Sequence, residues 1–444
     1  MSNVFCRVCA RTHQALRIGN RNWQILLSGR GACQNAPYWL VATMFLSLSL
    51  LARFACAQPA ENITVEPGTF DRLVPLVAPE ARCISLCDSQ NLIAFGHDRT
   101  WKEAQITMYR LNSTGQPIFP ATTWQLPCPE VFQKQGTYPI GLAFHPRLPL
   151  LYVWNELGVH FTNPPTTETD DVRKFDHLLI YDIAKSPPEL LVSLCRGSEY
   201  LYGQNGAPLA VDPEGTFLCV ASLRDLKNAG SWRFGRFALD AEGLPKVVDE
   251  KLPREEKIKK IVEWNATPAA TPTEKTPFEY VYLFPGNHFG SVGNFHIENK
   301  GTVLAGGATG VMCWRPDDPN VTLSGLPIRK HSMTFLARHP TLPLVYASKH
   351  QGDGVFRVQF IDGYWSLVPR GWTIPEVKLN SPPVMLRGKH LAVAGAYQVY
   401  ICPLDDQGNV RGPATSVQLL SPTGRTLAYS DKFDKLYAGV DLSK

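Results

Sequence analysis

Several short segments of the chain place polar side chains of chemically useful types beside apolar runs. Four follow a run that we expect to be the second strand of a repeated unit, and one precedes a first strand: His97-Asp98, Asn155-Glu156, Arg224-Asp225, Lys349-His350 and, before the strand, Asn287-His288. Carboxylates, imidazoles and cations of these kinds can transfer a proton or bind an anion. Whether they meet in space depends on the elements that carry them.

Other candidate motifs point to structure more than to chemistry. His145 and His339 recur in one His-Pro turn, which favours a structural role, and His296 alternates within an expected strand, as core histidines do. The glycine-rich segment 286–293 opens a strand and not a helix, so we expect no phosphate loop. Cys6, Cys9, His13 and Cys33 have partial zinc-ligand spacing but no second pair. We therefore expect no metal and no cofactor.

The elements that must position the polar segments are repeated along the chain. The segment Gly141–Val153 recurs as Phe335–Ala347, as a degraded copy at Thr426–Ala438 and as a turn variant at Pro208–Val220. Each copy is an apolar run, a tight turn and a second apolar run. The Asp-Pro-Glu-Gly turn at 212–215 has proline and glycine where a type I turn favours them. Two antiparallel strands are expected per copy, and third and fourth apolar segments usually follow.

Four strands per unit are typical of a propeller blade, so the predicted fold is an all-β β-propeller. Equivalent positions count seven units: Leu86, Phe144, Val211, Ile297, Arg338, Arg387 and Tyr429. One interval, 211–297, is about twice the usual ~40–50 residues of a blade. It contains either an insertion at about 250–276, with a short helix over 254–264, or an extra blade. The last unit stops after two strands, so the last blade is incomplete or closed by an N-terminal strand near 63–75.

The first 57 residues predict a secretory signal peptide. They carry six arginines and no acidic residue or lysine, then the apolar run Trp39–Leu51 and the small-residue site Ala55-Cys56-Ala57. A transit peptide and an uncleaved membrane anchor are the alternatives. Removal of residues 1–57 leaves one propeller domain over 58–444, in a secreted or periplasmic protein.

Charge and cysteine content narrow the class of partner. Of the 44 basic residues, all but the six in the leader remain after residue 57, which gives 38 against 39 acidic ones. The net basic charge therefore belongs to the leader, and we expect no nucleic-acid partner and a monomeric protein. Seven cysteines follow Gln58, an odd and scattered set that favours small core residues over a disulfide framework, although one or two bridges could form after export.

The strand-turn-strand units resemble the lactonase-like, YVTN-type β-propeller repeat of bacteria. The segment Leu151–Asn155 carries Tyr-Val-x-Asn after a His-Pro turn, and the turns at Ala210–Gly215 and Leu420–Arg425 are similar to those of the family. The resemblance runs in patches from about residue 83 to 444, and one unit keeps the full Tyr-Val-x-Asn core. It implies a ligand site at the channel mouth, where loops after the second strands and between blades converge.

Two functions follow from this placement. The first is an exported scaffold that binds a protein, glycan or small ligand, with Asn155, Arg224, Asn287 and His350 as candidate ligand-binding residues. The second, implied by the resemblance, is a hydrolase of a sugar lactone. Water would then be activated by Glu156, His97 or His288, and Arg224 and Asn155 would stabilise the oxyanion. Propellers carry many unrelated functions, so both hypotheses stay open.

Overall fold

The structure is a computed structural model of the 444-residue chain. It describes residues 61–79, 81–98, 104–127, 137–157, 178–194, 209–224, 232–247, 252–266, 280–284, 294–298, 301–307, 310–315, 318–325, 334–349, 354–361, 364–374, 377–379, 381–419 and 426–441. Contacts divide the chain between Phe54 and Ala55. The predicted leader, residues 1–57, lies outside the described residues, and the following account concerns the second unit.

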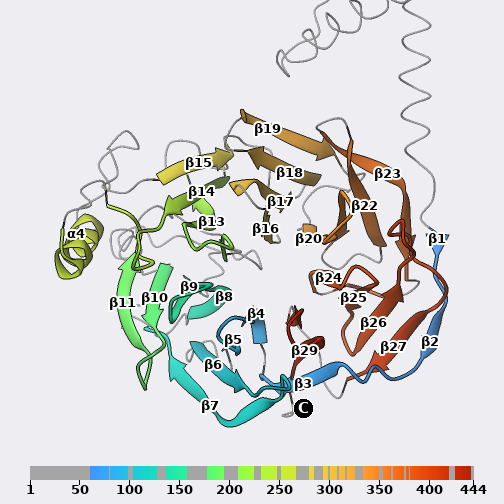
Figure 1. The fold of residues 1–444 in the computed structure, drawn as a ribbon, viewed down its shortest axis with the longest axis horizontal. Helices are drawn as coiled ribbons and strands as arrows, with labels where there is room; N and C mark the ends of the chain where they lie inside the picture. Colours follow the sequence, from blue (N-terminus) through green and yellow to red (C-terminus); the bar gives the residue numbers. More distant parts are fainter. Residues whose placement is uncertain are drawn as a thin grey trace, which may run out of the picture. The chain divides into compact units, whose positions relative to one another are not determined.

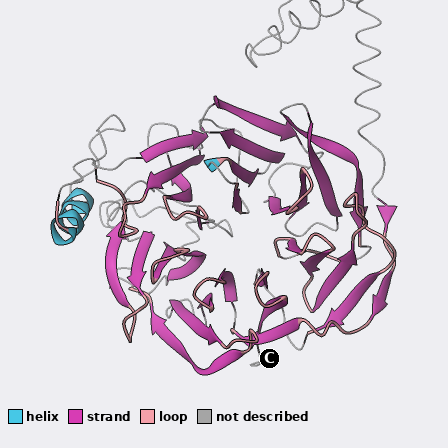
Figure 2. Ribbon diagram, viewed as in Figure 1, coloured by secondary structure: helices cyan, strands magenta, loops and turns pink. Residues whose placement is uncertain are grey.

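The described strands form seven sheets arranged around a ring, and the fold is a seven-bladed β-propeller, as predicted (Figures 1 and 2). Six sheets contain four consecutive antiparallel strands, and the first strand of each is innermost. Blade 1 consists of β4 (Ala81–Cys87), β5 (Leu92–Asp98), β6 (Ala104–Leu111) and β7 (Pro117–Gln125). Blade 2 consists of β8 (Thr137–Phe144), β9 (Leu150–Leu157), β10 (Leu178–Asp182) and β11 (Glu189–Leu194). Blade 3 consists of β12 (Leu209–Val211), β13 (Phe217–Arg224), β14 (Trp232–Ala238) and β15 (Tyr280–Phe284).

The remaining blades repeat this order. Blade 4 consists of β16 (Phe295–Ile297), β17 (Val303–Gly307), β18 (Gly310–Arg315) and β19 (Asp318–Gly325). Blade 5 consists of β20 (Thr334–Arg338), β21 (Leu344–Lys349), β22 (Gly354–Ile361) and β23 (Tyr364–Thr373). Blade 6 consists of β24 (Val384–Leu386), β25 (His390–Ala394), β26 (Gln398–Pro403) and β27 (Ala414–Gln418). Blade 7 begins with β28 (Leu427–Ser430) and β29 (Lys435–Val440).

The N-terminal segment completes blade 7, which confirms closure by an N-terminal strand. Strand β3 (Leu73–Val77) pairs in parallel with β29, with Leu73 opposite Leu436. Before that, β1 (Glu61–Asn62) pairs in parallel with β23, and β2 (Val65–Pro67) with β27. We call residues 61–77 the strap, because this segment adds a strand to three consecutive blades (Figure 1).

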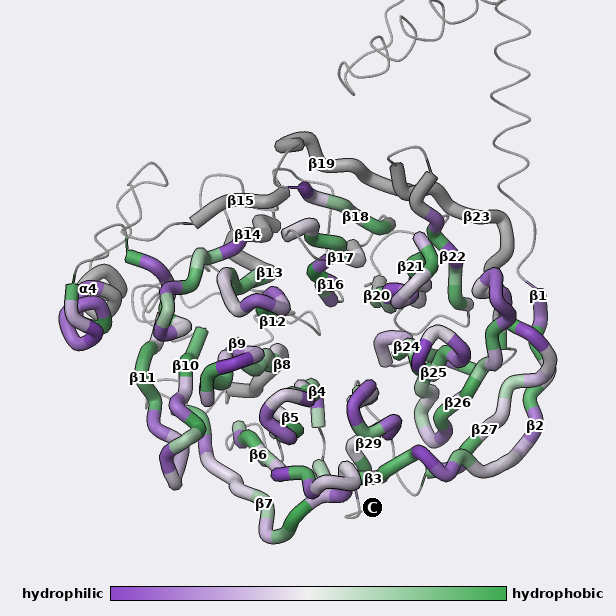
Figure 3. Tube along the Cα trace, in the orientation of Figure 1, coloured by the Kyte–Doolittle hydropathy of each residue, from purple (hydrophilic) through white to green (hydrophobic). Residues whose placement is uncertain are grey.

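The core lies between neighbouring blades. Successive side chains of a strand point to opposite faces of its sheet, so a strand that is apolar throughout can pack on both sides. In β9, Leu151 and Val153 pack in one cluster with blade 1, whereas Leu150 and Tyr152 pack in another with blade 3. Figure 3 shows similar apolar stretches in strands such as β10 and β26. Stacking of blades therefore explains the near-continuous apolar runs of the sequence.

A repeated tyrosine joins three pairs of blades. The hydroxyl of Tyr152 in blade 2 donates to the Gly243 carbonyl of blade 3 at 2.6 Å, and the equivalent Tyr346 in blade 5 donates to Gly408 of blade 6 at 2.8 Å. Tyr437 closes the ring in the same way, with a 2.7 Å bond to Gly115 of blade 1. Burial raises the pKa of each phenol, so the hydroxyls stay protonated donors.

The long interval between the third and fourth units holds an insertion and not an eighth blade among the described residues. Helix α4 (Arg254–Ala266) confirms the predicted helix, and it lies outside the ring beside β11 (Figures 1 and 2). Its Ile258 packs on the blade 2–blade 3 core, and its Lys257 ammonium lies 2.9 Å from the Asp240 carboxylate. The described part of the chain contains no helix with the length and apolar character needed to cross a membrane.

Candidate functional site

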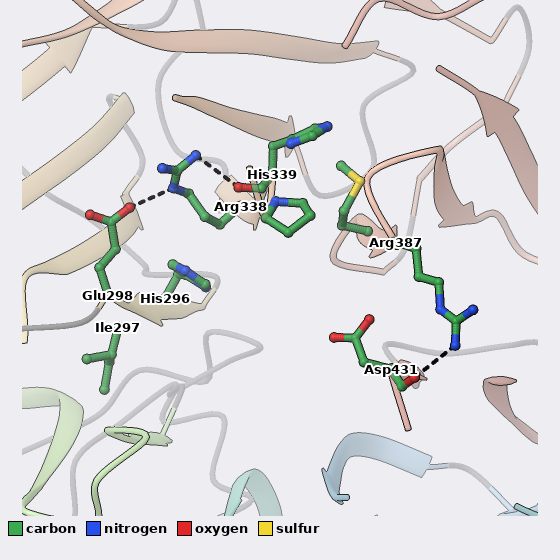
Figure 4. Close-up of a pocket in the computed structure, with 9 residues that line it drawn as sticks. His296, Ile297, Glu298, Arg338, His339, Arg387 and Asp431 are labelled. Atoms are coloured by element: carbon green, nitrogen blue, oxygen red, sulfur yellow. Dashed lines mark hydrogen bonds and ion pairs between the residues drawn. The ribbon is translucent and has the colours of Figure 1, made fainter. Parts of the chain in front are cut away.

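Four consecutive blades line an open cavity of about 550 Å³ at their innermost strands. All its lining residues lie in the last two positions of an innermost strand, β16, β20, β24 or β28, or in the turn just after it. We call it the blade 4–7 cavity; it is lined by His296, Ile297, Glu298, Arg338, His339, Pro340, Met385, Arg387 and Asp431. The first-to-second-strand turns of the four blades therefore build one site (Figure 4).

His339 forms part of the wall, and its ring is fully used by the backbone. Nδ1 accepts the Leu342 amide proton at 3.0 Å, and Nε2 lies 3.1 Å from the Gly388 carbonyl of the next blade. His145 repeats this arrangement, with Leu148 N at 2.9 Å and Gly215 O at 3.3 Å. Burial lowers the pKa of both imidazoles, which favours the neutral form that these bonds need. The predicted structural role of the two histidines is confirmed.

Arg338 is held on the blade 4 side of the cavity by an ion pair and by backbone oxygens. Its Nε lies 2.6 Å from Oε1 of Glu298, in the neighbouring blade. Its Nη1 donates to the carbonyls of His339 at 3.0 Å and Leu344 at 2.9 Å, and also to that of Leu342. The charges of Arg338 and Glu298 therefore compensate each other within the wall.

Arg387 is held in a similar way on the opposite side of the cavity. Its Nη1 lies 3.3 Å from Oδ2 of Asp434, and its Nη2 donates to the main-chain oxygen of Asp431 at 3.1 Å. Asp434 also pairs with Arg72 of the strap segment at 2.9 Å and accepts the Tyr429 hydroxyl proton at 2.5 Å. These donors and the two arginines hold the pKa of Asp434 below its usual range.

Two polar groups face the cavity without a hydrogen-bond partner among the described residues: the His296 imidazole and the Asp431 carboxylate. In Figure 4 both point into the space between blades 4 and 7, whereas the guanidinium groups of Arg338 and Arg387 lie at its edges. Burial lowers the pKa of His296 to about 4, so this ring is neutral at pH 7. Burial, with the nearby Asp88 carboxylate, raises the pKa of Asp431.

His296 thus differs from the sequence-based expectation of a satisfied core histidine. The alternation in β16 is real, because Phe295 and Ile297 are buried on the other face. His296 points to the opposite face of this strand, however, and there it lines a cavity and finds no bonding partner in the described part of the protein. A two-residue periodicity cannot distinguish these two surroundings.

We expect the stability of the protein to fall as pH decreases from about 6.5 to about 4, partly through His296. The unfolded imidazole binds a proton near pH 6.5 and the folded one near pH 4, so protonation favours the unfolded state in this window. The free energy of unfolding should fall by about 2 kcal/mol between these pH values, after allowance for the part of the ring that contacts solvent. Urea unfolding from pH 7 to 4 measures it, and His296→Gln should remove that share of the slope. An unchanged slope in this variant would contradict the assignment.

Four of the seven sequence-predicted site residues lie on the other face of the ring. His97, Asn155, Glu156 and Arg224 lie at the ends of second strands, beside the starts of first strands, as in the pairs His97–Ala81 and Asn155–Pro139. The blade 4–7 cavity lies at the ends of first strands. Asn287, His288 and His350 lie outside the described residues. Convergence of the seven residues at one mouth stays a prediction.

Two of these residues have described side chains, and both are buried. His97 is 4% exposed, and its Nε2 lies 2.7 Å from the Thr107 hydroxyl. Asn155 has no exposed area, and its amide nitrogen and oxygen find no hydrogen-bond partner in the described part of the chain. Alternation along β5 points His97 towards blade 7, with Ile93 and Phe95, whereas Asn155 follows Leu151 and Val153 towards blade 1. The two side chains therefore occupy different blade interfaces.

Sequence reasoning missed Glu298 and Asp431 as site residues, although Glu298 directly follows the counted position Ile297 and Asp431 lies two residues after the counted position Tyr429. Ile297, Arg338, Arg387 and Tyr429 served only to count blades. A usable signal was present: four successive units place an ionisable residue at the end of the first strand or in the turn that follows it. Residues at equivalent turn positions of a ring of repeats meet at one face.

Comparison with known proteins adds little beyond the architecture. No protein-family model and no curated sequence matches the chain. Similar solved structures include a periplasmic gluconolactonase of Pseudomonas aeruginosa, with 12% identity and a TM-score of 0.48 over 76% of this chain and 85% of that one. They also include the β-propeller domain of Cps50 (Swd1) from Myceliophteria thermophila, with 9% identity, a TM-score of 0.46 and coverage of 81% and 97%. A Lactobacillus plantarum protein has 13% identity, a TM-score of 0.46 and coverage of 76% and 84%. At these values the likenesses carry no argument about activity, and the blade count rests on the strand pairing itself.

Proposed function

We propose that this protein is an exported, non-catalytic β-propeller that binds a small polar ligand in the blade 4–7 cavity. The observation that carries the proposal is that His296 and Asp431 face the cavity without a hydrogen-bond partner among the described residues. Asp431 is exposed and His296 is half-buried, so a ligand that enters the cavity can bond both groups in place of solvent. The volume of about 550 Å³ lies within the range of roughly 300–1,000 Å³ that small-molecule sites occupy.

The chemistry of the cavity favours binding over lactone hydrolysis. Hydrolysis requires a base that activates water and donors aimed at the developing oxyanion. The Arg338 and Arg387 guanidinium groups are engaged by carboxylates and carbonyls at the cavity edges. An imidazole with a pKa of about 4, as in His296, is a weak base at neutral pH. The residues of this cavity therefore give the lactonase hypothesis no specific support.

A cavity-filling variant tests the site. A mixed pool of small amines, polyols and carboxylates is screened for ligands by thermal shift, and affinities are then measured by calorimetry. Met385→Trp should reduce the affinity of any ligand about tenfold or more, because the indole occupies cavity volume. Tyr397→Trp is the matched control: Tyr397 is 58% exposed and lies in the turn between β25 and β26, on the opposite face of the same blade. Undiminished binding to Met385→Trp, or no ligand in the pool, would contradict the proposal.

Export is the second part of this proposal, and it rests on the leader of the sequence. Cleavage after Ala57 would leave Gln58 as the first residue, shortly before the strap begins at Glu61. N-terminal sequencing of protein from the native source should therefore give Gln58. A mature chain that begins at Met1 would show that the leader is not removed.

A further inference from the structure

Three of the four charged side chains that line the blade 4–7 cavity have an ion-pair partner in contact, and the fourth, Asp431, has none among the described residues. Arg338 pairs with Glu298 at 2.6 Å, and Arg387 pairs with Asp434 at 3.3 Å. The Asp431 carboxylate has no ion pair or hydrogen bond among the described residues, although the main-chain oxygen of Asp431 accepts a hydrogen bond from Arg387. Asp431 is therefore the carboxylate that faces the cavity without a counter-ion in contact.

The surroundings of Asp431 disfavour its negative charge. Burial raises its pKa, and the nearby charges of Asp88 and Asp434 add to the effect, whereas that of Arg387 opposes it. The guanidinium of Arg387 lies on the side of the Asp431 main chain, away from the space that the carboxylate enters (Figure 4). A cation placed in that space would compensate the charge that the protein leaves exposed to the cavity.

His296 supplies a second acceptor on the opposite wall. Its neutral ring has one nitrogen with a free lone pair, and the imidazole points across the cavity towards Asp431 (Figure 4). Pro340 and Met385 line the same space and offer apolar contact. An anionic ligand would face the Asp431 carboxylate unfavourably, and a neutral hydroxyl would form a weaker bond to it than an ammonium group does.

We propose that the ligand of the blade 4–7 cavity is a small organic molecule with a protonated amine and an apolar body. The ammonium group pairs with the Asp431 carboxylate, while the apolar body contacts Met385 and Pro340. This inference deepens the proposed binding function and rests on it. It names the ligand class, which the proposed function leaves open.

Three probes with one carbon skeleton test the ligand class: cyclohexylamine, cyclohexanol and cyclohexanecarboxylate. Each is titrated into the full-length protein carrying ¹³C-methyl methionine, and the Met385 methyl signal, identified by its loss in Met385→Leu, reports occupancy. We expect cyclohexylamine to shift this signal at a concentration at least about tenfold lower than cyclohexanol, because charge-assisted bonds are roughly twice as strong as neutral ones. Cyclohexanecarboxylate should bind most weakly.

Matched variants then assign the effect to one carboxylate. Asp431→Asn keeps the shape of the side chain and should reduce amine affinity about tenfold while changing alcohol affinity little. Asp406→Asn changes an exposed aspartate of blade 6 outside the cavity and should change neither. If Asp431→Asn fails to fold, the comparison of the three probes on the unsubstituted protein decides alone.

The possible results separate this inference from the proposed function. Equal affinity for amine and alcohol, or tightest binding of the carboxylate, would overturn the cationic ligand but leave a small-ligand site in place. Preference for the amine that survives Asp431→Asn would overturn the role of Asp431. If none of the probes moves the Met385 signal and Met385→Trp also leaves ligand binding unchanged, both proposals are wrong.

Discussion

Leu76→Asp should destabilise the protein by about 4 kcal/mol or more, an effect at the upper end of single substitutions. Leu76 lies in β3, the strap strand that completes blade 7, and it is 2% exposed. It packs in the cluster that joins blade 7 to blade 1, with Phe95 and Tyr437. The substitution removes an apolar side chain and buries a carboxylate without a partner. Urea unfolding measures the loss.

Val77→Asp is the matched control for this prediction. Val77 is the next residue of the same strand, but it points to the other face and is 39% exposed. The Val77→Asp substitution should lower the free energy of unfolding by no more than about 1 kcal/mol. If Leu76→Asp does not fold, Leu76→Ala should still cost about 3 kcal/mol. Equal losses for the two aspartate variants would show that β3 does not close the ring through its buried face.

Gly408→Ala should cost about 3 kcal/mol, because it breaks one of the tyrosine contacts between blades. Gly408 has a φ of +73°, and an added Cβ would lie 2.5 Å from the Tyr346 hydroxyl oxygen and 2.6 Å from Leu344 Cδ1. The left-handed backbone costs an alanine about 1 kcal/mol. Displacement of the Tyr346 hydroxyl, which is buried and donates to the Gly408 carbonyl at 2.8 Å, adds about 2 kcal/mol. Thermal and urea unfolding measure the total loss of stability from the two effects.

Gly412→Ala isolates the backbone part of this cost. Gly412 lies in the same blade with a φ of +74°, but no atom lies within 4 Å of an added Cβ. The Gly412→Ala substitution should lower the free energy of unfolding by only about 1 kcal/mol. In addition, Tyr346→Phe should destabilise the natural protein by about 1–2 kcal/mol and the Gly408→Ala variant by much less. Equal effects of the two glycine substitutions would rule out the inter-blade contact as the cause.

The sequence was sufficient to predict the scaffold because a propeller is built from local units. The positions Leu86, Phe144 and Arg387, chosen from the repeat, all lie at the end of an innermost strand or just after it. The turn that begins at Asp212 could also be predicted from its residues. The Asp212 carboxylate accepts hydrogen bonds from the amides of Thr216 and Phe217, which are only four and five residues later. Such features depend on residues a few positions apart, which a single sequence displays.

The site could not be predicted in the same way, because it depends on contacts between blades. Glu298 gains its role from Arg338, 40 residues later in the chain. The cavity position of Asp431 depends on Arg387, 44 residues earlier. Placement of the candidate site at the ends of the second strands came from resemblance in fold, whereas the described cavity is formed at the ends of the first strands. Repeats predict which residues are equivalent, but not at which end of the ring a cavity forms.

The strap imposes an order on the folding of the chain. Its strands are synthesised before any blade, yet their partners β23, β27 and β29 come in the last third of the sequence. Arg72 and Asp434, which form an ion pair, are separated by 362 residues. Blades 1 to 4 can form from consecutive residues, whereas ring closure joins residues far apart in the sequence, so we expect it to be slow. During synthesis, residues 61–77 lack their partner strands until the C-terminal strands appear, and we expect them to be open to a chaperone or a protease for that interval.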